Sequence, residues 1–288
     1  MTVKNIVRHI TESAEIYTDA DGNKCPTIGL KALTSIAEEQ NISVRDAEIA
    51  ALKNGIIPRR YLRNIGTIGL DGQLKLLQSS VAVVGAGGLG GTIIELMARQ
   101  GIGHIIIIDN DRITEPDLNR QLMSTEKNLG QYKAVVAAKR VAKINSAVTV
   151  NTLLEKLTAE NARRFLNGAT VVADALDNLP SRLAVEDACR DLGIPLVHGT
   201  IAGFLGQLTT IFPKDAGLRS LYGSASKFPE QGIETKIGNP SATPSIIAAW
   251  QVQEIVKIIT GIGKPLRNSL LLLDMMEDNT ERIEFTKQ

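Results

Sequence analysis

A glycine-rich turn lies between an apolar run and a helical pattern, where its residue types and spacing could bind phosphate. Gly85, Gly87 and Gly90 fit the spacing GxGxxG within the sequence VAVVGAGGLGG. The first glycine allows a tight turn, the second lets backbone amides approach a phosphate, and the third lets helix and strand pack closely. Asp109 ends the next apolar run, IIIID, where a carboxylate can accept hydrogen bonds from ribose hydroxyls. This pattern predicts an adenosine nucleotide and leaves NAD open, while a packing turn without a ligand is the structural alternative.

Further side chains favour a triphosphate over a dinucleotide. Arg120 and Lys133 follow Asp109 along the chain, and Asp177 and Asn178 follow the apolar run of a later strand. In an open parallel sheet, ligands bind at the carboxyl ends of the strands. A guanidinium and an ammonium neutralise phosphate oxygens, and an aspartate can hold Mg²⁺. The residues therefore predict a polyphosphate with Mg²⁺, because a hydride-transfer site would not need these groups.

The order of apolar and helical patterns predicts the elements that must position these residues. From Ser80 to about residue 202, apolar runs of strand length alternate with segments of helical spacing. Strands that alternate with helices of about 10 to 15 residues favour a parallel sheet covered on both faces. Residues 206–213 and 268–285 are predicted as antiparallel strands, and residues 245–261 as a long helix. The predicted fold class is α/β: a Rossmann-like, mostly parallel sheet with helices on both faces, antiparallel C-terminal strands and a small helical N-terminal appendage.

Two segments lie outside this alternation. Residues 1–58 have helical spacing at 28–40 and 43–55 and are predicted as a helical N-terminal extension, followed by a second domain over 59–288. Residues 214–244 form a long run rich in Gly, Ser, Pro and Lys. A loop of that length inside a compact domain is usually functional or disordered.

Composition excludes several classes of protein. The chain has 32 Lys and Arg against 31 Asp and Glu, a net charge of +1, so no overall field favours nucleic acid or a membrane. No apolar run approaches the roughly 18 residues of a membrane span, and the first residues lack the apolar stretch of a signal peptide, so a cytoplasmic protein is expected. Neither Cys25 nor Cys189 has a partner at metal-ligand spacing, so no structural zinc is expected. Cys189 is expected in the core.

At these residues the chain resembles the family of ThiF, MoeB and HesA proteins, the bacterial relatives of ubiquitin-activating enzymes. The resemblance covers about residues 59–288, and its motifs stand in the family's order. They are RRYLRN (59–64), VGAGGLGG (84–91), DNDRITEPDLNRQ (109–121), GQYKA (130–134), ADALDN (173–178) and HGTIAGFLGQ (198–207). Several linked motifs in order are far more specific than a single GxGxxG.

The resemblance implies a particular chemistry: ATP and Mg²⁺ adenylate the C-terminal glycine of a small ubiquitin-like sulfur-carrier protein of the MoaD or ThiS kind, releasing pyrophosphate. Asp177 would hold the metal, and Arg120 and Lys133 would act on the phosphates. Arg63 is similar to the arginine that the family donates across a homodimer interface onto the triphosphate, so a homodimer is implied. A surface salt bridge is the alternative for Arg63. The nucleotide would lie against Gly85, Gly87, Gly88, Gly90, Asp109, Asp111, Asn119, Gln121 and Asn178.

The chain departs from the family pattern at several positions. Residues 214–244 contain no cysteine, whereas many relatives bind zinc or form a thioester or acyl-disulfide with cysteines in this region. The chemistry is therefore expected to stop at the acyl-adenylate, with residues 214–244 clamping the tail of the carrier. Asp117 stands where relatives usually have asparagine. The alternatives are an enzyme that adenylates a non-protein carboxylate, such as a tRNA threonylcarbamoyladenosine dehydratase, a nucleotide-binding scaffold, and an NAD-dependent enzyme.

Overall fold

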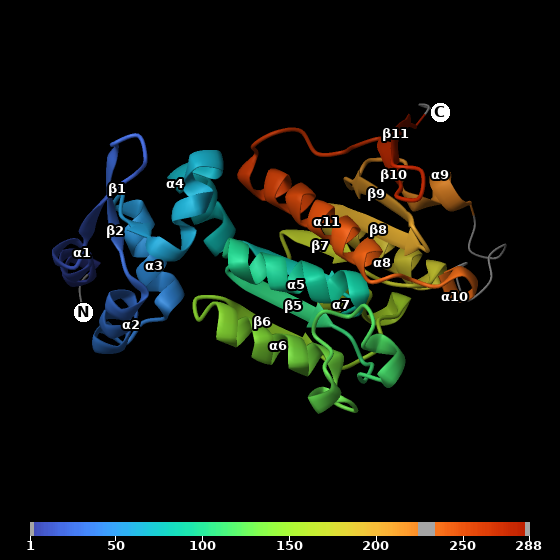
Figure 1. Cartoon of the computed structure of the whole chain (residues 1–288), viewed down its shortest axis with the longest axis horizontal. Helices are drawn as coiled ribbons and strands as arrows, with labels where there is room; N and C mark the ends of the chain where they lie inside the picture. The colour runs from blue at the N-terminus through green and yellow to red at the C-terminus, as the bar shows by residue number, and fades with distance from the viewer. Residues whose placement is uncertain (1–2, 224–233, 286–288) are drawn as a thin grey trace.

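A twisted eight-stranded sheet forms the centre of the computed structural model, which describes residues 3–223 and 234–285 (Figure 1). The strand order is β11-β10-β9-β8-β7-β4-β5-β6. The parallel strands are β4 (Ser80–Val84), β5 (His104–Ile108), β6 (Thr149–Leu153), β7 (Val171–Asp174) and β8 (Leu196–Ala202). The antiparallel strands are β9 (Leu205–Ile211), β10 (Ser269–Asp274) and β11 (Asn279–Glu284). The predicted α/β class, with a mostly parallel sheet and antiparallel C-terminal strands, is confirmed.

Helices cover both faces of the sheet (Figure 1). Val81 and Val83 of the central strand β4 pack into one apolar cluster, and Ala82 and Val84 pack into another on the opposite face. Both faces of a parallel strand are therefore buried, which explains its continuous apolar run. The first cluster includes side chains of α4 (Leu62–Gln78), α5 (Gly88–Gln100), α6 (Lys133–Ile144) and α11 (Ala242–Thr260). The second includes side chains of α7 (Ala159–Leu166) and α8 (Leu179–Leu192).

The strand order places a crevice at the carboxyl end of β4. From β4 the chain moves to β5 on one side of the sheet, and it later returns to β7 on the other side. Such a reversal of strand order opens a crevice between the helices that leave the two sides, and ligands of open α/β sheets bind there. Asp109 directly follows β5, and residues 175–178 directly follow β7. The fold therefore brings the predicted ribose and metal residues to one edge.

Residues 3–58 form an N-terminal unit with an apolar cluster of its own. The predicted helices are present, and three short strands accompany them. Ser43 caps the third helix by accepting a hydrogen bond from the amide of Asp46 at 3.0 Å. The elements are α1 (Val3–Glu12), β1 (Glu15–Thr18), β2 (Lys24–Ile28), α2 (Leu30–Gln40), α3 (Val44–Lys53) and β3 (Ile57–Pro58). The three strands were not predicted from the sequence because each is too short to show alternating polarity.

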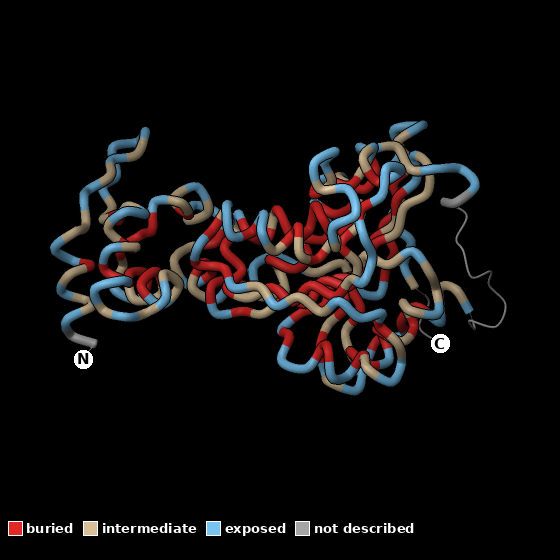
Figure 2. The backbone as a smooth tube through the Cα atoms, turned by 90° about the horizontal axis from the view of Figure 1, so that it is seen from below, coloured by how far each residue is buried: buried red, intermediate tan, exposed pale blue. Residues whose placement is uncertain are grey.

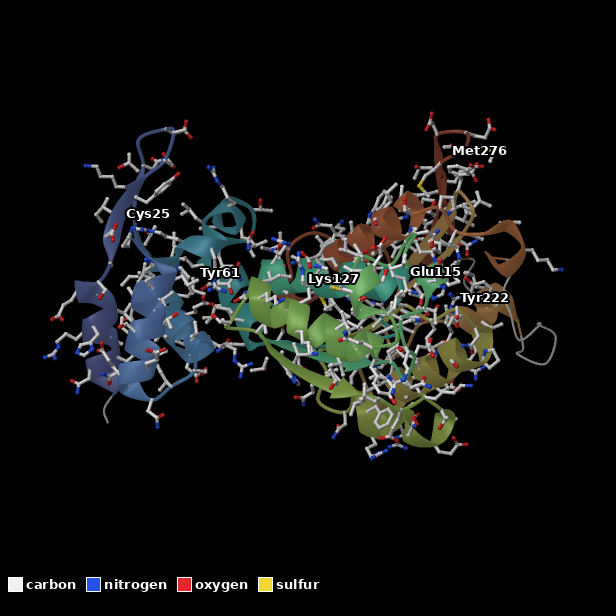
Figure 3. The ribbon with its side chains drawn as sticks, turned by 60° about the horizontal axis from the view of Figure 1, so that its bottom comes forward. Cys25, Tyr61, Glu115, Lys127, Tyr222 and Met276 are labelled. Carbon is white, nitrogen blue, oxygen red and sulfur yellow. The ribbon has the colours of Figure 1, made fainter. Side chains whose placement is uncertain are left out.

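Buried contacts join the N-terminal unit to the sheet domain. Tyr61, in the short helix η1 (Arg59–Tyr61), is fully buried and packs with Leu52 of α3 and Leu77 of α4. Its hydroxyl donates to Glu48 at 2.9 Å and accepts from the side-chain amide of Asn145, which follows α6, at 2.9 Å. Figure 2 shows buried backbone in both parts, and Figure 3 shows Tyr61 between them. A separate domain over residues 1–58 stays a prediction.

The junction contains a titratable group that makes stability depend on pH. Burial raises the pKa of Glu48 from 4.5 to about 7, although Arg60 and the Tyr61 hydroxyl oppose the shift. A carboxyl with a raised pKa stabilises the fold below its unfolded pKa, and this contribution is lost as the pH rises through the folded value. Relative to Glu48→Gln, the wild type should lose ~1–3 kcal/mol of unfolding free energy between about pH 4.5 and 7. Denaturant unfolding of both proteins across this range is the test, and a pH-independent difference would contradict the assignment.

The segment predicted as a long loop, residues 214–244, contains two short helices, α9 (Leu218–Tyr222) and α10 (Glu234–Ile237). Its residues 224–233 lie outside the described residues, and so does much of the predicted clamp. Two 3-10 helices, η2 (Glu115–Asp117) and η3 (Glu126–Asn128), lie between β5 and α6. None of the helices in residues 3–223 and 234–285 is long and apolar enough to span a bilayer.

Candidate nucleotide site

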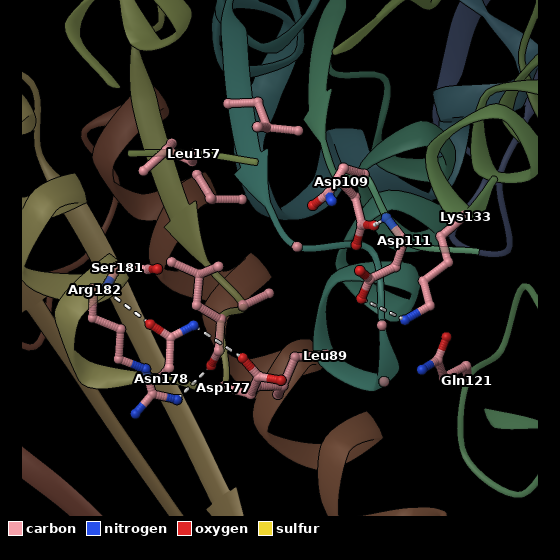
Figure 4. Close-up of a pocket in the computed structure, with 18 of the residues that line it drawn as sticks. Leu89, Asp109, Asp111, Gln121, Lys133, Leu157, Asp177, Asn178, Ser181 and Arg182 are labelled. Carbon is pink, nitrogen blue, oxygen red and sulfur yellow. Dashed lines mark hydrogen bonds and ion pairs between the residues drawn. The ribbon is translucent and has the colours of Figure 1, made fainter. Parts of the chain in front are cut away.

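A cavity of about 530 Å³ opens at the carboxyl ends of β4, β5 and β7 (Figure 4). Its volume is in the range of cofactor-sized ligand sites. Most of the residues predicted for the site line it: Gly85, Gly87, Gly88, Asp109, Asp111, Arg120, Gln121, Lys133, Asp177 and Asn178. Three predicted residues do not line it: Arg63, Gly90 and Asn119.

The turn between β4 and α5 needs glycine for steric reasons. Gly85 has φ of +94°, and a Cβ there would lie 2.6 Å from the carbonyl oxygen of Ala175. A Cβ on Gly90 would collide with the carbonyl oxygen of Gly85. Gly90 therefore serves close packing of α5 on the turn instead of lining the cavity. The N-terminus of α5, with Gly88 as its first residue, faces the cavity and provides a partial positive charge that can bind phosphate.

The Asp109 carboxylate is held by two backbone amides. Its Oδ2 accepts a hydrogen bond from Ala86 at 2.7 Å, and its Oδ1 accepts one from Asp111 at 2.7 Å. Burial raises the pKa of Asp109, while these amides and Lys133 act in the opposite direction. The carboxylate is thus oriented before any ligand binds, with free lone pairs that can accept hydrogen bonds from ribose hydroxyls.

Two cations lie beside the phosphate turn, each paired with an aspartate. Lys133 is the first residue of α6, and its Nζ lies 3.1 Å from Asp111 Oδ2 and 4.0 Å from Asp117 Oδ2. Arg120 Nη2 lies 3.9 Å from Asp117 Oδ1, and the same oxygen accepts a hydrogen bond from Gln121 Nε2. Asp117 is buried and also accepts hydrogen bonds from the backbone and hydroxyl of Thr114 at 2.9 Å. Asp117, which in the sequence stood out only as a departure from the family pattern, therefore orients Gln121, Arg120 and Lys133.

Across the cavity, the turn after β7 exposes the carboxylate of Asp177, which does not cap the following helix, α8 (Figure 4). Asn178 caps α8 by accepting from the Ser181 amide at 3.0 Å, so the cap is not Asp177. Asn178 Nδ2 donates to Asp177 Oδ1 at 3.2 Å. Asp177 is exposed to the cavity and can still bind a cation. A single carboxylate fits Mg²⁺, which binds one or two carboxylates together with substrate phosphates and water.

Besides Gly90, two residues predicted for the site have other surroundings, and several residues that line the cavity were not predicted. Arg63 is exposed on α4, away from the cavity lining. Asn119 donates to the backbone carbonyl of Asn239 at 3.2 Å, which joins two loops beside the cavity. Arg182 lines the cavity and was not predicted. Its position four residues after the cap Asn178, one helical turn further on, is the signal that could have found it.

These features are typical of a class: nucleotide-binding α/β proteins whose site lies at the switch point of a Rossmann-like sheet, here with a glycine-rich turn, a carboxylate after the next strand and two cations. The sequence model of the ThiF family matches residues 61–288, and the chain belongs to the ThiF family. The resemblance seen in the motifs is thereby confirmed.

Individual relatives agree with this assignment. The chain is similar to the SAMP-activating enzyme E1 of Haloferax volcanii, at 36% identity over 231 residues that cover 78% of this chain and 84% of that enzyme. It is 34% identical over 242 residues to the sulfur carrier protein adenylyltransferase of Thermus thermophilus, covering 78% of this chain and 86% of that enzyme. Among solved structures, E. coli MccB with ATP has a TM-score of 0.69 at 21% identity, covering 99% of this chain and 88% of that chain. At that identity the likeness is one of fold.

Proposed function

We propose that this protein uses ATP to adenylate the C-terminal glycine of a ubiquitin-like sulfur-carrier protein, releasing pyrophosphate. The observation that carries the proposal is that Lys133 and Asp177 lie on opposite sides of the cavity (Figure 4), with Arg120 beside Lys133 through their shared partner Asp117. The names of the two relatives that are 34–36% identical, a SAMP-activating enzyme and a sulfur carrier protein adenylyltransferase, support the choice of substrate.

The chemistry needs charge neutralisation and positioning more than a base. The carrier's carboxylate oxygen attacks the α-phosphorus, and pyrophosphate leaves with the electrons of the broken P–O bond. Both reactants are anionic, so the barrier falls when cations and backbone amides hold them in line. Lys133 and Arg120 can donate to phosphate oxygens once they leave Asp111 and Asp117. Mg²⁺, held by Asp177, would neutralise further phosphate charge.

The experiment that tests this proposal is ATP–pyrophosphate exchange with and without small carrier proteins that end in Gly-Gly. Exchange that requires such a carrier, and that is lost when its last glycine is deleted, would support the proposal. Exchange driven by a small or tRNA-borne carboxylate, with no response to any carrier, would favour the alternative of a non-protein substrate. The absence of exchange with every substrate, despite ATP binding, would favour a nucleotide-binding scaffold.

We further propose that the active form is a homodimer in which Arg63 acts on the triphosphate bound by the other subunit. The support is that Arg63 is exposed on α4 and, among the described residues, has no ion-pair or hydrogen-bond partner for its side chain. Arg63 does not line the cavity of its own chain, so in this proposal a second copy brings it to the nucleotide. Charge developing on a phosphate in flight is stabilised when an arginine is supplied across an interface.

Mixing of inactive variants tests this arrangement. Arg63→Ala and Asp177→Ala should each be inactive alone, and a mixed, re-equilibrated sample should regain about a quarter of the wild-type exchange, because half of the dimers are mixed and each has one complete site. The exposed Arg8, paired with Glu12, provides a control, since Arg8→Ala should remain active. If the mixture stays inactive while both proteins are dimeric, Arg63 does not act across the interface.

A further inference from the structure

A series of buried polar side chains, joined by hydrogen bonds, lies behind the turn that carries Asp177. Asp174, the last residue of β7, and His198, on β8, are fully buried, and His198 Nδ1 lies 2.7 Å from Asp174 Oδ2. Neither residue lines the cavity. Burial lowers the pKa of His198, so the imidazole is neutral and donates its Nδ1 hydrogen to the carboxylate. The adenylation chemistry derived above leaves both residues without a role.

Asp174 and Arg182 hold both backbone groups of the residue next to Asp177. Asp174 Oδ1 accepts a hydrogen bond from the amide of Leu176 at 2.9 Å. Arg182 Nη2 donates to the carbonyl oxygen of Leu176 and to Thr200 Oγ1, the latter at 3.1 Å. Arg182 Nε lies 3.7 Å from Asp174 Oδ2 and makes no hydrogen bond among the described residues, so the guanidinium and the buried carboxylate attract each other as an ion pair. The direction of Asp177 therefore depends on Asp174.

At its other end, this series of polar side chains reaches Tyr222, the last residue of α9. The Tyr222 hydroxyl lies 3.1 Å from His198 Nε2 and 3.1 Å from Gln207 Oε1 on β9, and its hydrogen can serve either acceptor. The two rings meet edge to face, with centroids 5.8 Å apart. Figure 3 shows Tyr222 at the end of the molecule remote from Tyr61. A continuous polar path thus links α9 to the turn of Asp177.

We propose that Tyr222 and His198 are positioning residues that, through Asp174 and Arg182, fix the turn presenting Asp177 to Mg²⁺. The inference rests on the proposed function, because it requires Asp177 to bind the metal. Mg²⁺ demands near-ideal ligand geometry, so a turn that is free to rotate binds it less well. Groups that hold a metal ligand in place typically change metal affinity by about 10–100-fold when removed. The position of α9 and the binding of Mg²⁺ with ATP are then energetically coupled.

Calorimetric titration of ATP with and without Mg²⁺ tests the proposal without requiring turnover. The dissociation constant without Mg²⁺ divided by that with Mg²⁺ measures how much the metal contributes to binding. Tyr222→Phe removes only the hydroxyl, and His198→Asn keeps an amide that can donate to Asp174. Both variants should lower this ratio by about three- to tenfold while ATP binding without metal stays within about twofold of wild type. Tyr17→Phe, in β1 of the N-terminal unit, is the matched control and should leave the ratio unchanged.

Three outcomes would overturn the proposal, and they are distinguishable. An unchanged ratio in Tyr222→Phe and His198→Asn, with a reduced ratio in Asp177→Ala, would contradict the positioning role of Tyr222 and His198 but support Asp177 as the metal ligand. An unchanged ratio in Asp177→Ala itself would remove both the metal site and the role built on it. An equal loss of affinity with and without Mg²⁺ in folded Tyr222→Phe, checked by its thermal unfolding, would indicate a general structural role.

Discussion

Lys133→Ala is expected to lower carrier-dependent ATP–pyrophosphate exchange by about 10²–10³-fold. The side chain is only 11% exposed and is the ammonium group nearest to Asp111 and Asp117 in the cavity. Its removal deletes a cation from the phosphate side, leaves Asp111 without its ion-pair partner and leaves Asp117 with Arg120 alone, at the place proposed for the triphosphate. Electrostatic interactions of a side chain that is only 11% exposed are less screened by water, so the loss is larger than for a surface charge.

The matched control for Lys133 lies on the same helix. Lys139 of α6 is exposed, and Lys139→Ala should leave exchange within about twofold of wild type. Steady-state exchange rates of both variants, at saturating and at limiting ATP, separate weaker binding from slower chemistry. Activity of Lys133→Ala within about threefold of wild type would contradict the assignment of Lys133 to the phosphates.

Asp177→Asn is expected to lower exchange by about 10²-fold at millimolar Mg²⁺. The asparagine keeps the shape of the side chain and an oxygen that can accept the hydrogen bond from Asn178, so the turn should remain folded. What is lost is the negative charge that holds a divalent cation. A rise in the Mg²⁺ concentration needed for half-maximal exchange is therefore part of the expected result.

The control for this charge change lies on the helix that follows the turn. Asp191, in the last turn of α8, forms an exposed ion pair with Arg163 at 3.6 Å and no other ion pair among the residues that the structure describes. Asp191→Asn should leave both the exchange rate and its Mg²⁺ dependence unchanged. If Asp177→Asn shows the Mg²⁺ dependence of the wild type, the aspartate does not bind the metal.

Much of the site could be predicted because its residues follow one another within single strand-turn-helix units. Gly85, Asp109 and Lys133 each stand at the end of a strand or the start of a helix, where apolar runs and glycine mark the position. The carboxyl ends of parallel strands share one edge, so sequence order alone brings these residues together. The alternation of apolar runs with helical spacing predicted the parallel sheet, and the later apolar runs at 206–213 and 268–285 predicted its antiparallel extension.

The remaining features depend on contacts between segments far apart in the sequence. The path from Asp174 through His198 to Tyr222 joins β7, β8 and α9, and no local pattern indicates which buried histidine meets which carboxylate. Asp117 orients Gln121 and the two cations through the packing of its own short helix. Arg63 has no role that a single chain can reveal, because its proposed target lies on another subunit.

Transfer of the α-phosphate label from ATP to a carrier protein tests the central claim most directly. The protein would be incubated with α-labelled ATP, Mg²⁺ and a small ubiquitin-like carrier ending in Gly-Gly, and the carrier would be isolated by rapid acid quench. We expect label on the carrier as an acyl-adenylate, formed with one pyrophosphate for each AMP bound, and absent when the terminal glycine is deleted. Release of pyrophosphate with the label found only in free AMP or on a small carboxylate would contradict the account.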